Sequence, residues 1–199
     1  MITPHDLTGL ILAGGEGRRM GGRDKGLEPF AGRPLVAHVS ERFADQVAEL
    51  LISANRHIGA YQHYADRVVE DAESDFHGPL MGLYRGLCAA RTPWLLVAPC
   101  DTPTLPHDLA TRMIAGLHNA DIAVAHDGQR AHPVVALMRT HLADALGQAL
   151  AAGERSVGGF YAGQRICTVD MADCASGFTN VNTPDDKARL EATLAREAS

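Results

Sequence analysis

The sequence has no uninterrupted apolar run approaching 18 residues, and nothing in it is therefore expected to span a bilayer. Cysteine is scarce: four occur among 199 residues. None of them forms a C-x-x-C pair, which argues against a disulfide framework or a structural zinc site. The first residues also lack the basic-then-apolar profile of a signal peptide. We therefore expect a cytoplasmic protein in which Cys100 is a buried, reduced thiol.

An excess of positive charge is also missing. The chain carries 18 Lys and Arg against 24 Asp and Glu, a net charge of −6. This balance argues against nucleic acid or an anionic membrane as a partner. The composition, 46% hydrophobic and 21% charged, excludes disorder over most of the chain. We find no repeat or interdomain linker, and predict a single domain over residues 1–199.

Apolar segments of strand length alternate with segments of helical periodicity. A final helix is expected to begin with a capping box formed by Thr183 and Asp186. This alternation predicts an α/β fold: a three-layer, mostly parallel, Rossmann-like sheet with helices on both faces. Ligands then bind beyond the carboxyl ends of the strands. Strands are expected at 7–13, 50–53, 67–71, 94–98, 121–125, 133–137 and 165–169, and helices at 34–50, 79–90, 106–117 and 140–152.

A glycine-rich loop follows the first predicted strand. Five glycines lie between Leu12 and Lys25, where their backbone amides could form an anion-binding nest. The loop fits neither the P-loop pattern, because Arg23-Asp24 replaces Lys-Ser/Thr, nor the dinucleotide fingerprint, because Met20 occupies the third glycine position. It favours a polyanion such as a triphosphate, since it also contains Arg18, Arg19, Arg23 and Lys25.

Polar residues follow other predicted strands. Asp101 lies between Pro99 and Pro103, whose rings stiffen the turn, and is the better candidate for Mg²⁺. Asp71 is a weaker candidate, because it lies in an acidic run typical of solvated surface. Both aspartates could instead be turn or cap residues. The side chain of Asn55 suits a nucleotide base and a turn equally well.

Residues 19–27, Arg-Met-Gly-Gly-Arg-Asp-Lys-Gly-Leu, resemble the molybdenum cofactor guanylyltransferases of the nucleotidyltransferase superfamily. Pro-Cys-Asp-Thr-Pro at 99–103 and Asn-Val-Asn-Thr-Pro at 180–184 are similar to further motifs of that family, and the resemblance extends from Leu12 to about Leu190. Sugar-phosphate members of the superfamily usually have proline where this chain has Asp24. Cytidylyltransferases for the same cofactor tend to have L-A-A-G where this chain has Gly14-Gly15.

The resemblance assigns roles to individual positions. It implies that Lys25, Asp101 and Arg19 are catalytic, and that Asp101 binds Mg²⁺. Its molybdopterin-binding residues are Gly78, Asn180, Asn182 and Arg155. Its nucleotide-binding residues are Leu12, Ala13, Gly14, Gly15, Lys25, Asn55, Asp71 and Asp101.

The segment 126–133, His-Asp-Gly-Gln-Arg-Ala-His-Pro, also resembles a family motif. Its histidines show no metal-ligand spacing, and we predict a hairpin with a type I′-like turn at Asp127-Gly128 that borders the pterin pocket.

The resemblance implies transfer of GMP from GTP to molybdopterin, with release of pyrophosphate. The N-terminal part would bind nucleotide, and the C-terminal part would contribute to the molybdopterin site. Expected partners are these substrates, with transient contact to cofactor-synthesis proteins or client molybdoenzymes. Two alternatives stay open: a nucleotidyltransferase that uses CTP or a sugar phosphate, and a non-catalytic cofactor carrier. The choice of GTP over CTP rests on the resemblance alone.

Overall fold

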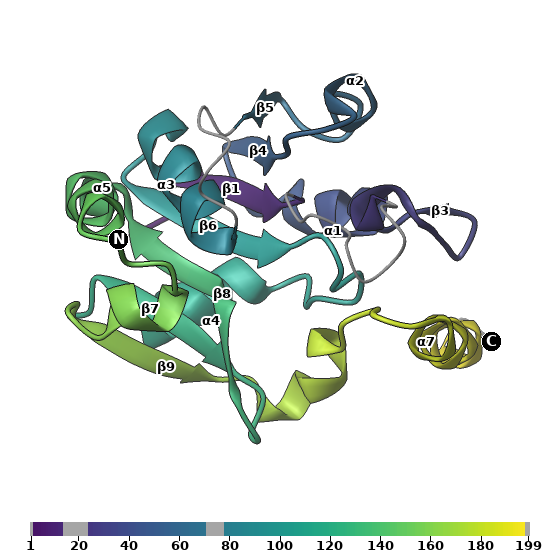
Figure 1. Cartoon of the computed structure of the whole chain (residues 1–199). Helices are drawn as coiled ribbons and strands as arrows, with labels where there is room; N and C mark the ends of the chain where they lie inside the picture. The colour runs from purple at the N-terminus through teal and green to yellow at the C-terminus, as the bar shows by residue number, and fades with distance from the viewer. Residues whose placement is uncertain (1, 14–23, 71–77, 198–199) are drawn as a thin grey trace.

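A seven-stranded sheet forms the centre of the computed structural model, which describes residues 2–13, 24–70 and 78–197 (Figure 1). The order of the strands across the sheet is β5-β4-β1-β6-β8-β7-β9. In chain order they are β1 (Leu7–Leu12), β4 (Glu49–Ser53), β5 (Arg67–Val69), β6 (Trp94–Pro99), β7 (Ile122–His126), β8 (Ala131–Arg139) and β9 (Ile166–Asp170).

The sheet is mostly parallel, as predicted. Strand β1 pairs in parallel with β4 and β6, β4 with β5, and β7 with β9. Strand β8 is antiparallel to both β6 and β7. The reason is the short loop between β7 and β8, because so few residues can join only antiparallel neighbours.

Helices cover both faces of the sheet and confirm the three layers. Leu7 and Ile11 of β1 point into one apolar cluster, whereas Leu10 and Leu12 point into another, as the alternation of a strand requires. Helices α1 (Leu35–Phe43) and α4 (Leu109–Gly116) supply buried side chains to the first cluster. The second cluster receives them from α3 (Pro79–Ala89), α5 (Ala143–Ala151) and α6 (Val157–Tyr161).

The C-terminal helix α7 (Pro184–Glu197) lies away from the sheet, on the side of α1 and β3 (Figure 1). A small hairpin of β2 (Pro29–Phe30) and β3 (Arg33–Pro34) packs here, and Phe30 shares a third apolar cluster with Leu35, Val181 and Leu190. The chain thereby brings its C-terminal part back to the residues that follow β1.

The predicted capping box begins α7. The Thr183 hydroxyl accepts a hydrogen bond from the Asp186 backbone N–H at 3.1 Å and donates one to the Asp186 carboxylate at 2.9 Å. The Thr183 hydroxyl thereby lowers the pKa of Asp186. The cap is confirmed.

Several boundaries differ from the prediction. Helix α1 ends at Phe43, although Val47 and Leu50 continue its periodicity. Gln46 explains the difference: its buried amide donates to the Arg42 carbonyl at 2.6 Å and accepts from the Ala110 N–H at 2.7 Å, which ties the end of α1 to the start of α4. Helix α4 begins three residues later than expected, at Leu109, and a 3₁₀ turn, Thr140–Leu142, precedes α5. The sequence analysis missed α2 (Ile58–Tyr61), α6, the β2–β3 hairpin and the 3₁₀ helix Ala172–Phe178.

The hairpin at 126–133 is confirmed, but its turn type was wrong. Residues 127–130 form a four-residue loop in which the backbone N–H of Asp127 donates to the Arg130 carbonyl at 3.1 Å. Gly128 has a positive φ of 89°, whereas Asp127 does not share the positive φ that a type I′ turn needs at both central residues. The Asp127 carboxylate accepts from the N–H groups of Gln129 and Arg130, both at 2.8 Å, and this stabilises the longer loop.

Candidate active site

The candidate site lies where β1 and β6 end side by side. From β1 the chain leads to β4 on one side, and from β6 it leads to β7 on the other, so the strand order reverses between them. Such switch points hold ligands in open α/β sheets. The Leu12 carbonyl accepts from the Cys100 N–H at 3.0 Å, and the Ala13 N–H donates to the Ser53 carbonyl at 2.9 Å. These hydrogen bonds hold the predicted positions Leu12 and Ala13 against the ends of the neighbouring strands.

Three predicted site residues from distant parts of the chain meet just beyond the end of β6. The Lys25 Nζ lies 2.5 Å from Asp101 Oδ2 and 2.5 Å from Asn182 Oδ1. The side chain of Lys25 is 27% exposed and that of Asp101 is 14% exposed, so a ligand can still reach the cluster. The Lys25 ammonium thus contacts both Asp101, a predicted nucleotide-binding residue, and Asn182, a predicted molybdopterin-binding residue.

The turn after β6 holds Asp101 in place. The buried Thr102 hydroxyl donates to the Pro99 carbonyl at 3.1 Å, and the Asp101 carbonyl accepts from the Val181 N–H at 2.9 Å. Cys100 is a buried free thiol, as predicted, and burial raises its pKa to about 12. The thiol therefore stays neutral beside Asp101, and the carboxylate is the charged group that this turn presents.

One oxygen of Asp101 suits a metal ion. Within the described residues, Asp101 Oδ1 is buried and has no hydrogen-bond partner. A buried carboxylate oxygen without a donor is costly, and a hard cation that prefers oxygen ligands would satisfy it. The described part of the chain holds no cluster of three or more His, Cys, Asp or Glu residues suited to a metal. The donor set, one carboxylate, matches Mg²⁺ that arrives with phosphates and water.

The sequence analysis missed the residues that hold the backbone of Lys25. Asp24, to which the sequence analysis gave no role in the site, accepts a hydrogen bond from the Tyr61 hydroxyl and lies 3.0 Å from His57 Nδ1. Tyr61 and His57 belong to the unpredicted helix α2 and its N-cap. Gly26 could have indicated these contacts, because a glycine next to a candidate catalytic lysine suggests that other atoms approach the backbone closely.

Most of the remaining predicted positions that the structure describes lie just after a strand, at the start of a helix or on a connecting segment. Asn55 is exposed at the end of β4, and Asn180 is half-buried on the segment that leads to Asn182. Gly78 caps the N-terminus of α3 with a φ of 140°, a conformation that favours glycine. Gly14, Gly15, Arg19 and Asp71 lie outside the described residues, and their roles stay predictions.

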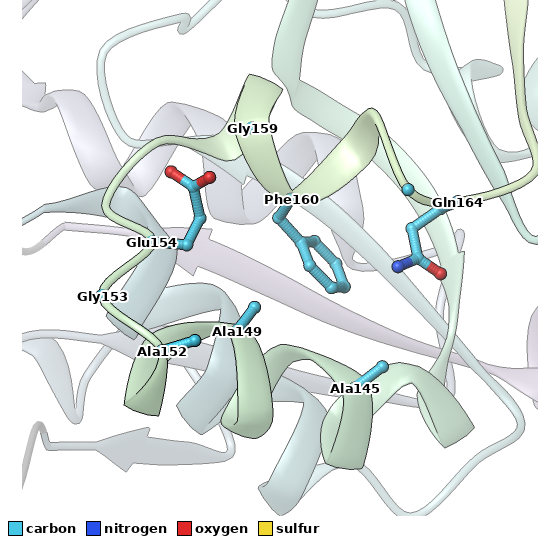
Figure 2. Close-up of a pocket in the computed structure, with 9 residues that line it drawn as sticks. Ala145, Ala149, Ala152, Gly153, Glu154, Gly159, Phe160 and Gln164 are labelled. Carbon is cyan, nitrogen blue, oxygen red and sulfur yellow. The ribbon is translucent and has the colours of Figure 1, made fainter.

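Arg155 lies on the loop between α5 and α6, among the helices that pack on the second apolar cluster. Its guanidinium donates to the backbone carbonyls of Leu150 and Glu154 at 3.0 and 2.7 Å. Beside it is a surface groove of about 540 Å³ between the two helices, into which the Phe160 ring points, while the Glu154 carboxylate at its edge turns toward the start of α6 (Figure 2). The described contacts of Arg155 hold this loop, and its predicted contact with molybdopterin stays a prediction.

The hairpin motif packs against the segment that carries the two asparagines. His132 is buried, lies 2.7 Å from an Asp127 carboxylate oxygen, and packs its ring on Phe178 with the ring centres 5.0 Å apart. Backbone and side-chain hydrogen bonds, that from Arg130 first, hold the pKa of Asp127 well below its usual range. Phe178 lies two residues before Asn180, so this arrangement supports the start of the asparagine segment.

The strand order and the cluster at the switch point define an α/β nucleotidyltransferase. A family model described as the MobA-like NTP transferase domain matches residues 9–165. The chain belongs to this family. In the described part of the chain, no helix has both the length and the apolar character that crossing a membrane requires.

Curated relatives agree with this family, and a solved structure agrees with the fold. The chain is 45% identical, over 93% of its length and 95% of the relative, to a molybdenum cofactor guanylyltransferase of Shewanella amazonensis. It is 42% identical to one of Shewanella sediminis, over 94% and 96% of the two chains. The crystal structure of molybdopterin-guanine dinucleotide biosynthesis protein A from Archaeoglobus fulgidus matches with a TM-score of 0.76 at 20% identity, covering 95% of this chain and 99% of that one.

Proposed function

We propose that this protein transfers GMP from GTP to a molybdopterin cofactor and releases pyrophosphate. The names of its curated relatives support this activity. The observation that carries it is the position of Lys25, whose ammonium contacts both Asp101 and Asn182. A group between a predicted nucleotide residue and a predicted molybdopterin residue is well placed to act at the bond that joins the two substrates.

The reaction needs positioning and charge stabilisation more than a general base. A terminal phosphate of the acceptor is already an anionic nucleophile toward the α-phosphorus of GTP, and no covalent enzyme intermediate is required. Lys25 would stabilise negative charge that builds on the α-phosphate and the departing pyrophosphate. Its contact with Asp101 would hold the ammonium just beyond the end of β6 until substrate arrives.

Mg²⁺ fits this proposal through Asp101, whose buried Oδ1 lacks a partner among the described residues. When bound there, the ion would supply Lewis-acid polarisation of phosphate oxygens. Asp101 itself would keep one oxygen for the metal and one for Lys25, and so hold the two positive groups apart.

One domain would serve both substrates. We assign Arg19 to catalysis with Lys25 and Asp101, the positions 12–15, 55 and 71 to the nucleotide, and Gly78, Asn180, Asn182 and Arg155 to molybdopterin. The return of the C-terminal segment to Lys25 supports this division, because Asn182 comes from the far end of the chain. We also propose a cytoplasmic location, since all four cysteines are free thiols.

A pyrophosphate-release assay tests the proposal. The protein is incubated with Mg²⁺ and each of the four nucleoside triphosphates, with molybdopterin, with a sugar phosphate or with no acceptor, and nucleotide binding is measured in parallel. We expect release that requires both GTP and molybdopterin. Release with CTP would show that the nucleotide substrate is CTP and not GTP. Release only with a sugar phosphate would show that the acceptor is a sugar phosphate and not molybdopterin. Nucleotide binding without any release would indicate a non-catalytic carrier.

A further inference from the structure

Lys25 is the residue on which the proposed function depends, and the chain on either side of it meets the same tyrosine. Asp24 precedes Lys25, and its carboxylate accepts a hydrogen bond from the Tyr61 hydroxyl. Gly26 follows Lys25 and packs against the same hydroxyl: a Cβ added at Gly26 would overlap the Tyr61 hydroxyl oxygen and lie 3.2 Å from Cζ and Cε1 of the ring. One side chain thus determines the position of both neighbours of the lysine.

The Tyr61 hydroxyl is not explained by packing. The side chain is fully buried in the first apolar cluster, where a phenylalanine ring would fill the same space. A buried hydroxyl needs a hydrogen-bond partner, and Asp24 provides it. Burial, with the bond to Asp24, raises the pKa of Tyr61, so the hydroxyl stays protonated and donates.

The second oxygen of Asp24 is also held. Asp24 Oδ2 lies 3.0 Å from His57 Nδ1, and the Asp24 side chain is only 11% exposed. His57 has a left-handed backbone with a φ of 53°, which turns the chain from β4 into α2. The same turn leads into the helix that carries Tyr61. Both carboxylate oxygens of Asp24 are therefore anchored to residues of one short segment.

We propose that Tyr61, acting through Asp24 and the close approach of Gly26, is a positioning residue that holds Lys25 at the reacting phosphates. This inference rests on the proposed function. Tyr61 touches neither substrate; it fixes the backbone from which the Lys25 side chain reaches Asp101 and Asn182. Small displacements of a catalytic group, of about 1 Å, can lower a rate by about 100-fold, which is why such an anchor matters.

The test is a double-mutant cycle between Tyr61→Phe and Lys25→Ala, with kcat for pyrophosphate release measured at saturating Mg²⁺, GTP and molybdopterin. We expect Tyr61→Phe to lower kcat by about 10- to 100-fold in the wild-type background. In the Lys25→Ala background the same change should have little further effect, because the hydroxyl acts through the lysine. Single-turnover measurement keeps the slow variants within range.

Two further variants separate positioning from stability. Tyr161→Phe is the matched control: its buried hydroxyl donates to the Pro133 carbonyl at 2.9 Å, on the opposite face of the sheet, so thermal stability should fall while kcat is kept. Gly26→Ala should lower kcat through overlap with the hydroxyl, and adding Tyr61→Phe should bring kcat close to that of Tyr61→Phe alone, because only the 3.2 Å contacts with the ring then remain.

The outcomes distinguish the two hypotheses. A wild-type rate in Tyr61→Phe, or an equal loss in both Lys25 backgrounds, would overturn the positioning role and leave the proposed function intact. If the wild-type protein itself releases no pyrophosphate from GTP with molybdopterin, it is the proposed function that fails.

Discussion

At the scale of single residues, the site is organised around one positive charge. Lys25 is partly buried, and it is held by a carboxylate and an amide that lie 76 and 157 residues away in the sequence. The ammonium would therefore need little rearrangement to stabilise an anionic transition state. Electrostatic stabilisation of this kind is often the largest contribution to catalysis.

Replacing either charged member of the pair should remove most of the activity. Lys25→Ala and Asp101→Ala should each lower kcat by about 100- to 1,000-fold, as the loss of one preorganised group does elsewhere. Circular dichroism should show that the fold survives, because neither side chain belongs to the apolar clusters. Lys187→Ala is the control, since the Lys187 ammonium lies 3.9 Å from Glu191 on α7, and kcat of this variant should stay unchanged. Near-normal turnover in Lys25→Ala would contradict the assignment.

The sequence predicted Lys25 and Asp101 as site residues, but it did not predict the contacts that hold Lys25 in place. Lys25 and Asp101 follow buried strands, and their position on a common edge of the sheet follows from the α/β pattern and the family resemblance. The sequence around Tyr61 does not predict a role in the site, because a tyrosine ring is equally typical of an apolar core. Only the folded chain shows that its hydroxyl donates to Asp24. The meeting of Asn182 with Lys25 could not be predicted either, because it depends on the packing of α7 against the β2–β3 hairpin.

At the scale of secondary-structure elements, the segments that periodicity predicts are present and their ends are not well predicted. The seven predicted strands all occur: runs of buried apolar residues specify the inner strands, whereas the edge strands β5 and β9 are mostly only partly buried or exposed. The ends depend on tertiary contacts, as the Gln46 amide shows when it stops α1 four residues before Val47. The antiparallel direction of β8 depends in turn on the Asp127 loop, whose side-chain hydrogen bonds replace the expected two-residue turn.

Asp121 joins three strands at one end of the sheet, just before β7. Its carboxylate accepts two hydrogen bonds from the Arg165 guanidinium, at 2.7 and 2.8 Å, and lies 3.3 Å from Arg139 Nε. Arg165 precedes β9 and Arg139 ends β8, where it also lies 4.4 Å above the Trp94 ring. The hydrogen bonds from Arg165 lower the pKa of Asp121 below the ordinary 3.8.

A lowered pKa in the folded state sets the sign of the pH dependence. The ionised carboxylate stabilises the protein fully above pH 3.8, and this stabilisation is lost as the pH falls through the native pKa. Asp121→Asn should lower the free energy of unfolding by about 1 kcal/mol at pH 7, a modest value because Arg165 is exposed to water. Urea unfolding at several pH values should show this difference shrinking below pH 3.8. The exposed Asp45→Asn is the control, and a difference that is constant with pH would contradict the role of the charge.

At the scale of the whole molecule, we propose that the chain behaves as one unit around its sheet. Strand β1 lies in the middle of the sheet, and its side chains reach both main apolar clusters, so neither face can unfold alone without exposing it. The third cluster ties α7 to Leu35 at the start of α1. The nucleotide and molybdopterin halves that we propose therefore share one core.

This architecture predicts a single thermal transition that GTP shifts as a whole. A ligand at about 100 times its Kd stabilises the folded state by about 2.7 kcal/mol, and in a chain of this size each kcal/mol raises the Tm by about 2–4 °C. We expect a larger rise for GTP with Mg²⁺ than for GTP with EDTA, because the buried Asp101 Oδ1 would gain a partner only from the metal. In Asp101→Asn the difference between the two conditions should disappear, while a rise with GTP alone remains. Calorimetry that resolves two transitions, of which GTP shifts only one, would show separate units, and an unchanged effect of Mg²⁺ in Asp101→Asn would move the metal to other ligands.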